Sequence, residues 1–292
     1  MLDCGWRTLI LENAADMQLN NGCLYVKNES EYRFPVKQIR NVVIASSQGS
    51  ISIPLLNELG NNNVNLVFCD KNRVPLCEVL NTGTNENSPG NIHKQIIWDN
   101  SRKQSVWQMV VKNKIRNQMR ILEMFGKPVP ETLKLCEIAT LPNDVSNREA
   151  QAARLYFSLL YGSGFRRHAP DGLNSAMNYG YTILRSSLDR LITGYGYLTA
   201  IGIKHANERN RFNLSCDIME PFRPFIDKVV TENLARELDW GYKKELIAVL
   251  NMSCVYKNRA MSLDNAMEMY FQDITRYIED GCSEIGEVDF ER

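Results

Sequence analysis

The feature that most constrains this chain is a change of hydrophobic periodicity near residue 90. Before it, short apolar segments alternate with turn residues, whereas after it apolar residues recur every three or four positions. Segment 81–91, NTGTNENSPGN, lies between the two patterns and has the composition of a linker. We therefore expect an α+β protein with a small β-rich N-terminal domain over 1–80, a linker over 81–91 and a larger all-α domain over 92–292.

The first domain is predicted to contain short strands and one helix. Asn20-Asn21-Gly22 separates two of the strands and is a turn signal that supplies positive φ. Leu55, Leu56 and Leu59 are at helical spacing in IPLLNELGNNN and predict the helix. This domain contains no cluster of catalytic residue types, so we expect it to serve packing or dimer contacts. The predicted strands are residues 6–12, 23–27, 32–36, 41–46, 64–70 and 74–80.

The second domain is predicted to be helical throughout. Val111, Ile115, Met119 and Leu122 follow one another at steps of 4, 4 and 3 and form one face of a long helix that ends before Gly126. The further predicted helices are residues 147–161, 175–200, 214–235, 240–252 and 263–280.

Composition indicates a soluble cytoplasmic protein. Eight cysteines are present without any CxxC pair, which favours reduced thiols over disulfides or a zinc ribbon. The N-terminus carries Asp3, Arg7 and Glu12 in its apolar part, unlike a signal peptide. No apolar run approaches the roughly 20 residues that a membrane helix needs, so we expect no membrane association.

The net charge of zero conceals an uneven distribution. Residues 91–190 carry 15 Lys and Arg against 8 Asp and Glu, whereas residues 191–292 carry 12 against 17. A basic helix is most often a solvated face, and the alternative is a phosphate-binding surface. The cations of the long predicted helix are Arg102, Lys103, Lys112, Lys114, Arg116 and Arg120.

Glu149 allows two interpretations. Ser146 and Glu149 match the S-x-x-E spacing of a capping box ahead of an apolar run, in which Glu149 would only satisfy the helix N-terminus. Small residues around it (Ala150, Ala152 and Ala153) would instead let another element approach the helix closely, which indicates a site.

A second group of candidate residues lies in KHANERNRFNLSCDIMEPFRP, residues 204–224. Asp217 and Glu220 are three positions apart and would share one face of a helix, downstream of His205. An exposed acidic face with an ordinary histidine is the simpler interpretation. Two carboxylates and an imidazole are also the ligand set of Mg²⁺ or Mn²⁺, whereas no cysteine is at a spacing that favours zinc.

Several neighbours are candidate phosphate or substrate contacts. Lys204, Arg209, Arg211 and Arg223 flank the acids, although each could pair with a nearby carboxylate instead. Tyr179 and Tyr181 lie in MNYGYTIL, where helical aromatics are usually core residues.

The segments SNREAQAARLYF, LNSAMNYGYTIL and the 204–224 stretch, together with the opening GWRTLIL, resemble the CRISPR-associated integrase, the metal-dependent subunit of the spacer-acquisition complex. The branch that accompanies type II systems is the most similar, and the resemblance covers essentially the whole chain. It implies a β-rich N-terminal domain, a helical catalytic domain, and a homodimer. Two such dimers would flank a small ferredoxin-like CRISPR adaptation protein in a larger complex.

The resemblance also implies the site. Glu149, His205 and Glu220 correspond to the catalytic metal ligands for Mg²⁺ or Mn²⁺, and Asp217 to an auxiliary acid that acts indirectly. The expected DNA-binding residues are Lys204, Arg223, Arg148, Tyr179 and Tyr181.

The implied reaction is transesterification, in which the 3′-hydroxyl of a captured DNA fragment attacks a phosphodiester at the edge of a CRISPR repeat. Two alternatives remain open at this point: a metal-dependent DNA nuclease without joining activity, and a non-catalytic DNA-binding assembly subunit.

Overall fold

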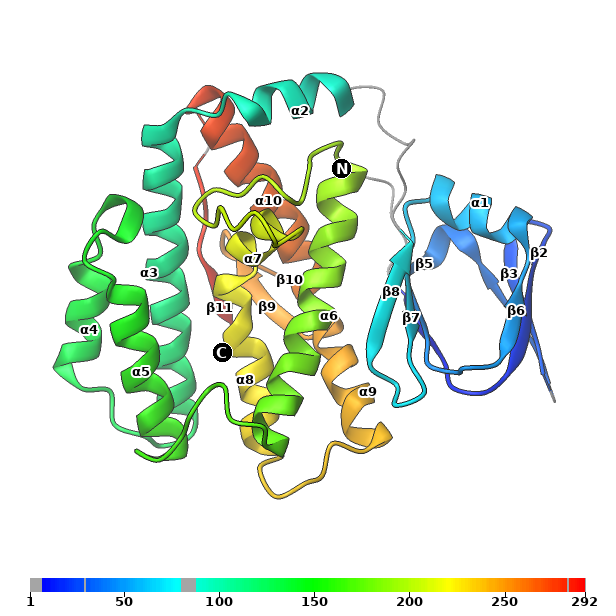
Figure 1. Cartoon of the computed structure of the whole chain (residues 1–292), viewed down its shortest axis with the longest axis horizontal. Helices are drawn as coiled ribbons and strands as arrows, with labels where there is room; N and C mark the ends of the chain where they lie inside the picture. The colour runs from blue at the N-terminus through cyan, green and yellow to red at the C-terminus, as the bar shows by residue number, and fades with distance from the viewer. Residues whose placement is uncertain (1–6, 29, 80–87, 283, 292) are drawn as a thin grey trace. The chain divides into compact units, whose positions relative to one another are not determined.

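The computed structural model describes residues 7–28, 30–79, 88–282 and 284–291 (Figure 1). The chain divides into two compact units. The first combines residues 1–92 with 189–197, and the second combines 93–188 with 198–292. The predicted division, with its linker over 81–91, did not assign residues 189–197 to the first unit.

Residues 7–79 of the first unit, as far as the structure describes them, form two four-stranded sheets and the expected helix, α1 (Ile53–Asn61). Its buried core includes Leu24, Val42, Leu55 and Leu66, which come from both sheets and from α1. One sheet has the order β1 (Arg7–Leu11), β5 (Ile39–Ile44), β7 (Asn65–Cys69), β8 (Pro75–Val79). The other has the order β4 (Glu31–Pro35), β3 (Cys23–Lys27), β2 (Ala15–Asn20), β6 (Gly49–Ile51).

Local sequence explains what was predicted in this unit and what was missed. Asn21 and Gly22 have φ of 49° and 71° and join β2 to β3, so the predicted turn is confirmed. The strand β2 was missed although its sequence, ADMQLN, alternates apolar residues with the exposed Asp16 and Gln18, as a half-buried strand does. The three-residue strand β6 pairs in parallel with β2 and carries no periodic signal of its own.

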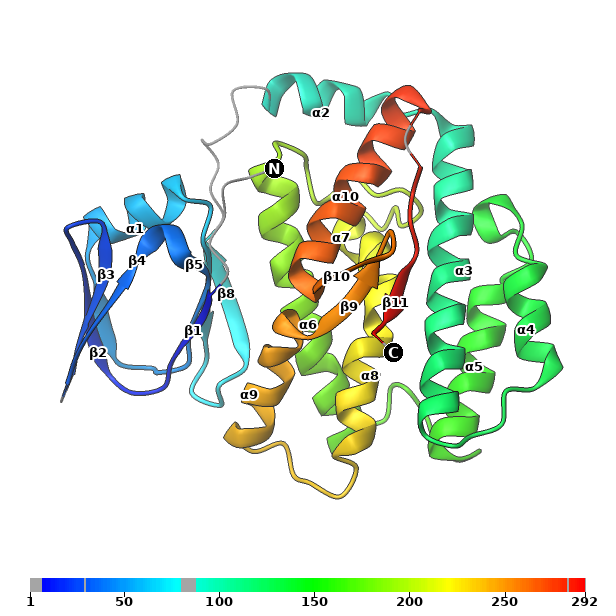
Figure 2. The same ribbon diagram turned by 180° about the vertical axis from the view of Figure 1, so that it is seen from behind.

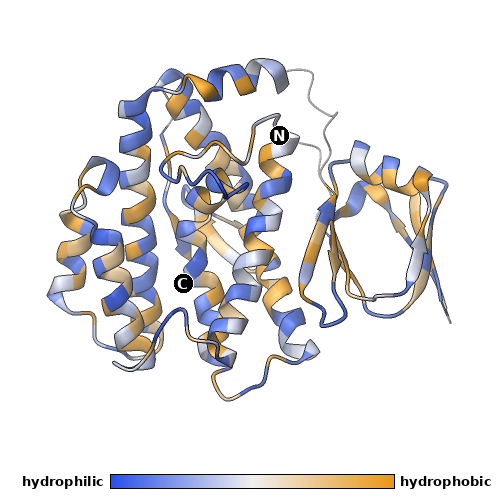
Figure 3. Ribbon diagram, in the orientation of Figure 1, coloured by the Kyte–Doolittle hydropathy of each residue, from blue (hydrophilic) through white to orange (hydrophobic). Residues whose placement is uncertain are grey.

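The second unit is mainly helical and is organised around α3 (Asn100–Met124). The predicted apolar face is buried, with Val111, Ile115 and Leu122 fully inaccessible, and the helix ends before Gly126 as expected. Hydrophilic residues are nevertheless interspersed along α3 (Figure 3). The other helices are α2 (Ser88–Ile96), α4 (Glu131–Ile138), α5 (Arg148–Tyr161), α6 (Gly172–Gly194), α7 (Asn213–Ile218), α8 (Arg223–Glu232), α9 (Trp240–Ala248) and α10 (Leu263–Asp280), with 3-10 turns η2 (Pro142–Asp144), η3 (Glu220–Phe222) and η4 (Val249–Asn251). The 3-10 turn η1 (Val36–Gln38), the beginning of α2 and the end of α6 belong to the first unit.

This unit also contains a small sheet that the prediction of an all-α domain did not include. Strands β9 (Ser253–Tyr256), β10 (Arg259–Ser262) and β11 (Val288–Phe290) form an antiparallel sheet in the order β10–β9–β11 (Figure 2). The Asn113 side chain of α3 donates to Val288 O at 2.8 Å and accepts from Val288 N at 2.9 Å, which fixes β11 beside α3. The strands are three or four residues long, too short to show a period in the sequence.

The predicted linker lies largely outside the described residues. Positions 81–87 are not described, and the remaining positions, 88–91, form the beginning of α2. Among the described residues, none of the helices combines the length and apolarity needed to span a bilayer.

Candidate metal and DNA site

The position of Glu149 depends on how α5 begins. The Asp144 carboxylate accepts hydrogen bonds from Arg148 N at 2.8 Å and from Glu149 N at 3.0 Å, and thereby satisfies the helix N-terminus. Asn147, at φ 52°, makes no side-chain cap, and the buried Ser146 Oγ has no hydrogen-bond partner among the described residues. The interpretation of Ser146 and Glu149 as a capping box is therefore wrong, and the Glu149 carboxylate points elsewhere.

Replacing Asp144 with alanine is expected to lower the free energy of unfolding by about 1–2 kcal/mol, because two backbone donors lose their acceptor. Urea denaturation of the variant measures this loss. Ser146→Ala is the matched control and should change stability much less, since its hydroxyl makes no hydrogen bond. A larger loss for Ser146→Ala than for Asp144→Ala would contradict this assignment of the cap.

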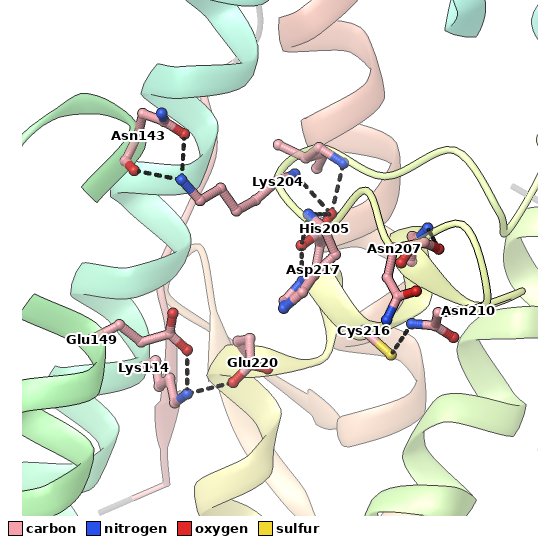
Figure 4. Close-up of polar contacts among 12 residues, drawn as sticks. Lys114, Asn143, Glu149, Lys204, His205, Asn207, Asn210, Cys216, Asp217 and Glu220 are labelled. Carbon is pink, nitrogen blue, oxygen red and sulfur yellow. Dashed lines mark hydrogen bonds and ion pairs between the residues drawn. The ribbon is translucent and has the colours of Figure 1, made fainter. Parts of the chain in front are cut away.

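Lys114 of α3 joins the two glutamates of the predicted metal site (Figure 4). Its Nζ lies 2.6 Å from Glu149 Oε1 and 2.5 Å from Glu220 Oε2, and Glu220 Oε1 pairs with Arg223 Nη2 at 2.9 Å. Burial alone would lower the pKa of Lys114, but the charges of Glu220 and Glu149 outweigh it and raise that pKa. Burial alone would raise the pKa of Glu220, but Arg223 and Lys114 together lower it. The Glu220 carboxylate is thus held in its charged state by Lys114 and Arg223.

Asp217 organises the loop that carries His205. Its carboxylate is completely buried and accepts from Ile203 N at 2.6 Å, Lys204 N at 2.9 Å and His205 N at 3.1 Å. His205 Nδ1 lies 2.5 Å from Asp217 Oδ1, and this hydrogen bond raises the pKa of His205 against the opposing effect of burial. A Cβ at Gly202 would lie 2.4 Å from His205 O, so the loop can pass this close only with glycine.

One face of α3 supports the whole site. Four residues of this helix follow one another at steps of 4, 7 and 3 positions and therefore lie on the same side of it: Lys103, Trp107, Lys114 and Asn117. Trp107 meets the His205 ring edge-on with centroids 5.7 Å apart, and Asn117 Nδ2 donates to Pro221 O at 2.8 Å. None of these roles was predicted. The available signal was that Lys114 and Asn117 lie within the apolar face of a helix, where a polar residue needs a buried partner.

Other cations of α3 pair within the protein. Arg116 bonds to Glu137 at 2.5 Å and pairs with Glu287, and Arg120 pairs with Asp289 at 3.5 Å. Arg116 and Arg120, two of the cations predicted to form a solvated or phosphate-binding face, are therefore partly buried and hold neighbouring segments.

The predicted DNA-binding residues have the following surroundings. The exposed Lys204 donates to Asn143 O at 3.0 Å and Oδ1 at 2.9 Å, and Arg148 donates to Gln151 at 3.1 Å. Arg223 lies over the Tyr181 ring at 4.7 Å, beside its ion pair with Glu220. Tyr179 and Tyr181 are only 3% and 7% exposed, as core aromatics are. Contacts of these residues with DNA stay predictions.

The hydroxyl group of Tyr181 belongs to a buried hydrogen-bonded cluster around Asp227. The Asp227 carboxylate accepts from Tyr181 OH at 2.5 Å and from Tyr156 OH at 3.0 Å. Burial raises the pKa of Asp227 to about 6, because two neutral hydroxyls only partly replace the water that the carboxylate has lost. Since Arg223 lies on the Tyr181 ring, this cluster supports the arginine that holds Glu220.

The raised pKa of Asp227 predicts a pH-dependent stability. The folded-state pKa of about 6 lies above the ordinary value of 3.8, so the folded protein binds the proton more tightly, and stability falls as pH rises through that interval. We expect Asp227→Asn to remove about 3 kcal/mol of this pH dependence between pH 4 and 7, at 1.36 kcal/mol per pKa unit. Denaturation at several pH values measures it, with the exposed Asp280→Asn as control. If the unfolding free energy of Asp227→Asn changed with pH as steeply as that of wild type, burial would not raise the pKa of Asp227.

The donor chemistry at the centre of the site fits a hard divalent cation. Glu149 and Glu220 approach one another around a cation, and the Asp217 hydrogen bond to His205 Nδ1 leaves Nε2 as the ring nitrogen for a ligand. Asp217 itself already accepts four donor contacts, about the capacity of a carboxylate. As placed, no group of three or more His, Cys, Asp or Glu side chains in the described part of the chain is arranged to hold a metal ion, and Lys114 lies between the two glutamates.

The chain matches known proteins over most of its length. It is 32% identical over 253 residues to the CRISPR-associated endonuclease Cas1 of Neisseria meningitidis serogroup C, covering 84% of this chain and 83% of that protein. Similar solved structures include a casposase bound to integration product, with a TM-score of 0.78 and 17% identity over 98% of this chain and 96% of that chain. They also include a Cas1 protein of Thermotoga maritima, with a TM-score of 0.73 and 15% identity over 96% of this chain and 99% of that chain. These two likenesses show the same fold.

The expected α+β fold, with its β-rich N-terminal and helical C-terminal parts, agrees with these structures. A family model described as CRISPR associated protein Cas1 matches residues 8–239, which include Glu149, His205 and Glu220. The chain therefore belongs to the Cas1 family of CRISPR-associated proteins.

Proposed function

We propose that this chain is a divalent-metal-dependent DNA endonuclease and integrase of CRISPR adaptation that acts in the cytoplasm. Family membership and the similarity to a CRISPR-associated endonuclease support the reaction class. The observation that supports the proposal is that Glu149, Glu220 and the Asp217-bound His205, from three separate segments, each contact a residue on the same face of α3: Lys114 for the two glutamates and Trp107 for the histidine.

In this proposal Glu149, Glu220 and His205 Nε2 hold Mg²⁺ or Mn²⁺. The ion would activate the attacking 3′-hydroxyl and stabilise the negative charge that develops on the phosphoryl oxygens. Asp217 keeps the proton on His205 Nδ1 and fixes the ring orientation, so that Nε2 presents its lone pair. Arg223 holds Glu220 by its other oxygen and orients that carboxylate.

DNA phosphates would bind at the exposed rim of this site. Lys204 is exposed on the His205 loop, and its ammonium is held by a single asparagine that a phosphate can replace. Arg148 lies one residue before Glu149 and is partly exposed. This binding should weaken steeply with salt, since it depends on neutralising phosphates.

The assembly is also part of the proposal. We expect a homodimer, and two dimers around a small ferredoxin-like adaptation protein, with a DNA fragment that has free 3′-hydroxyl ends and a repeat-containing target. A Cas1 chain in solved Cas6-RT-Cas1–Cas2 complexes has the same fold as this chain, at 18–19% identity.

A joining assay tests the reaction class. Labelled duplex with free 3′-hydroxyls is incubated with the protein, a repeat-containing plasmid and Mn²⁺, and the products are separated by size. Joined products support integration, strands that are only shortened support a nuclease without joining, and retention of DNA without chemistry supports a non-catalytic assembly subunit.

A further inference from the structure

Lys114 gives the centre of the site an internal charge balance. The carboxylates of Glu149 and Glu220 are neutralised by the ammonium of Lys114 and the guanidinium of Arg223. The Lys114 side chain is 11% exposed, so this ammonium has exchanged most of its water for the two carboxylates. A buried cation in such a place is expensive unless it is paired, and both of its partners belong to the proposed metal site.

The ammonium and a divalent ion would compete for the same oxygens. Lys114 Nζ lies 2.6 Å from Glu149 Oε1 and 2.5 Å from Glu220 Oε2. Mg²⁺ takes oxygen ligands at about 2.0–2.1 Å, which leaves no room for an ammonium between the same two atoms. Glu220 Oε2 therefore has to leave Lys114 Nζ, its ion-pair partner at 2.5 Å, before it can act as a metal ligand.

We propose that Lys114 is the built-in cation of this site: it holds Glu149 and Glu220 together in the metal-free protein and is displaced from them when the divalent ion binds. The inference rests on the proposed function, because it concerns the same two carboxylates. Lys114 thereby sets the affinity for the metal, since each binding event must break its two ion pairs.

The structure provides the means for this exchange. The lysine ammonium is carried by a flexible four-carbon stem, whereas the carboxylates are anchored on α5 and on η3, and Arg223 holds Glu220 through the oxygen that Lys114 does not contact. Two carboxylates, two protein cations and one divalent ion sum to a charge of +2. Metal binding would therefore turn a neutral site into a cationic one that favours a DNA phosphate, and DNA would in turn strengthen metal binding.

Direct Mn²⁺ binding tests the inference without any reaction. Free Mn²⁺ is measured by electron paramagnetic resonance during titration of the full chain, for wild type, Lys114→Met and Lys112→Met. Lys112 is the matched control, since it is a lysine of the same helix two positions away and its side chain points to another side. We expect Lys114→Met to bind Mn²⁺ about tenfold more tightly than wild type or more, a gain of about 1.4 kcal/mol per tenfold, and Lys112→Met to bind as wild type does.

The outcomes separate this inference from the proposed site. Equal or weaker Mn²⁺ binding by Lys114→Met overturns the role of Lys114 while leaving the metal site intact. Absence of Mn²⁺ binding in all variants overturns the metal site and the inference with it. Lys114→Gln, whose amide still donates to a carboxylate, is the second variant if methionine prevents folding, and it should also bind Mn²⁺ more tightly than wild type.

Discussion

Replacing Glu149 with glutamine is expected to lower the rate of DNA joining by about 100- to 1,000-fold or more, the loss that follows removal of one charge-stabilising group from an active site. Glutamine keeps the shape of the side chain but removes the negative charge that a divalent ion requires. Lys114 retains its ion pair with Glu220, so the fold should persist. The measurement is the joining rate at saturating DNA, together with DNA retention on a gel.

Glu131→Gln is the control for this prediction. Glu131 is a highly exposed acid at the start of α4 that pairs only loosely with Lys134 at 3.5 Å, so its loss should leave joining unchanged. DNA retention should survive in both variants, because both keep Lys204 and Arg148, the residues proposed to bind phosphates at the rim of the site. Normal joining by Glu149→Gln would remove this residue from the site.

Replacing Asp217 with alanine is expected to have the largest effect on stability, at least about 3 kcal/mol of unfolding free energy. Three backbone donors and the His205 ring lose a buried charged acceptor, and hydrogen bonds to charged groups contribute about 1.5–3 kcal/mol each. We also expect joining to be lost, because His205 loses the contact that orients its ring. Denaturation measures the first effect and the joining assay measures the second. Hydrogen exchange at the amides of Ile203, Lys204 and His205 shows whether the loop that Asp217 holds has been released.

Asp239→Ala provides the comparison for Asp217→Ala. Asp239 caps α9 through one bond from Tyr242 N at 2.7 Å and is 64% exposed, so its loss should cost only about 1 kcal/mol. Amide exchange in the His205 loop should stay slow in this variant. If Asp217→Ala left these amides as protected as in wild type, another group would have to hold the loop.

The parts of the fold that sequence could predict are those with a local physical cause. The turn at Asn21-Gly22 needs positive φ, and the long helix over 100–124 has a continuous apolar face. By contrast, β2 and β6 are defined by pairing with each other and with β3, which local composition does not show. The β9–β11 sheet depends on Asn113 and on a strand some thirty residues further along the chain.

The site was only partly predictable for the same reason. Glu149 matched a capping box by spacing, yet Asp144, two residues before Ser146, satisfies the helix, because Asn147 adopts a left-handed conformation that changes the local geometry. Lys114 belonged to a run of cations on the long helix, and its position within the apolar face indicated burial without identifying its partners. Only tertiary structure shows that its side chain lies between two carboxylates from distant segments.

The most direct measurement is a crystal structure of the protein soaked with Mn²⁺, with anomalous scattering to locate the ion. We expect one peak within about 2.0–2.6 Å of an oxygen of Glu149, an oxygen of Glu220 and Nε2 of His205, with the Lys114 ammonium moved away from both glutamates. A structure in which Lys114 still bridges the glutamates, with Mn²⁺ bound elsewhere, would contradict it.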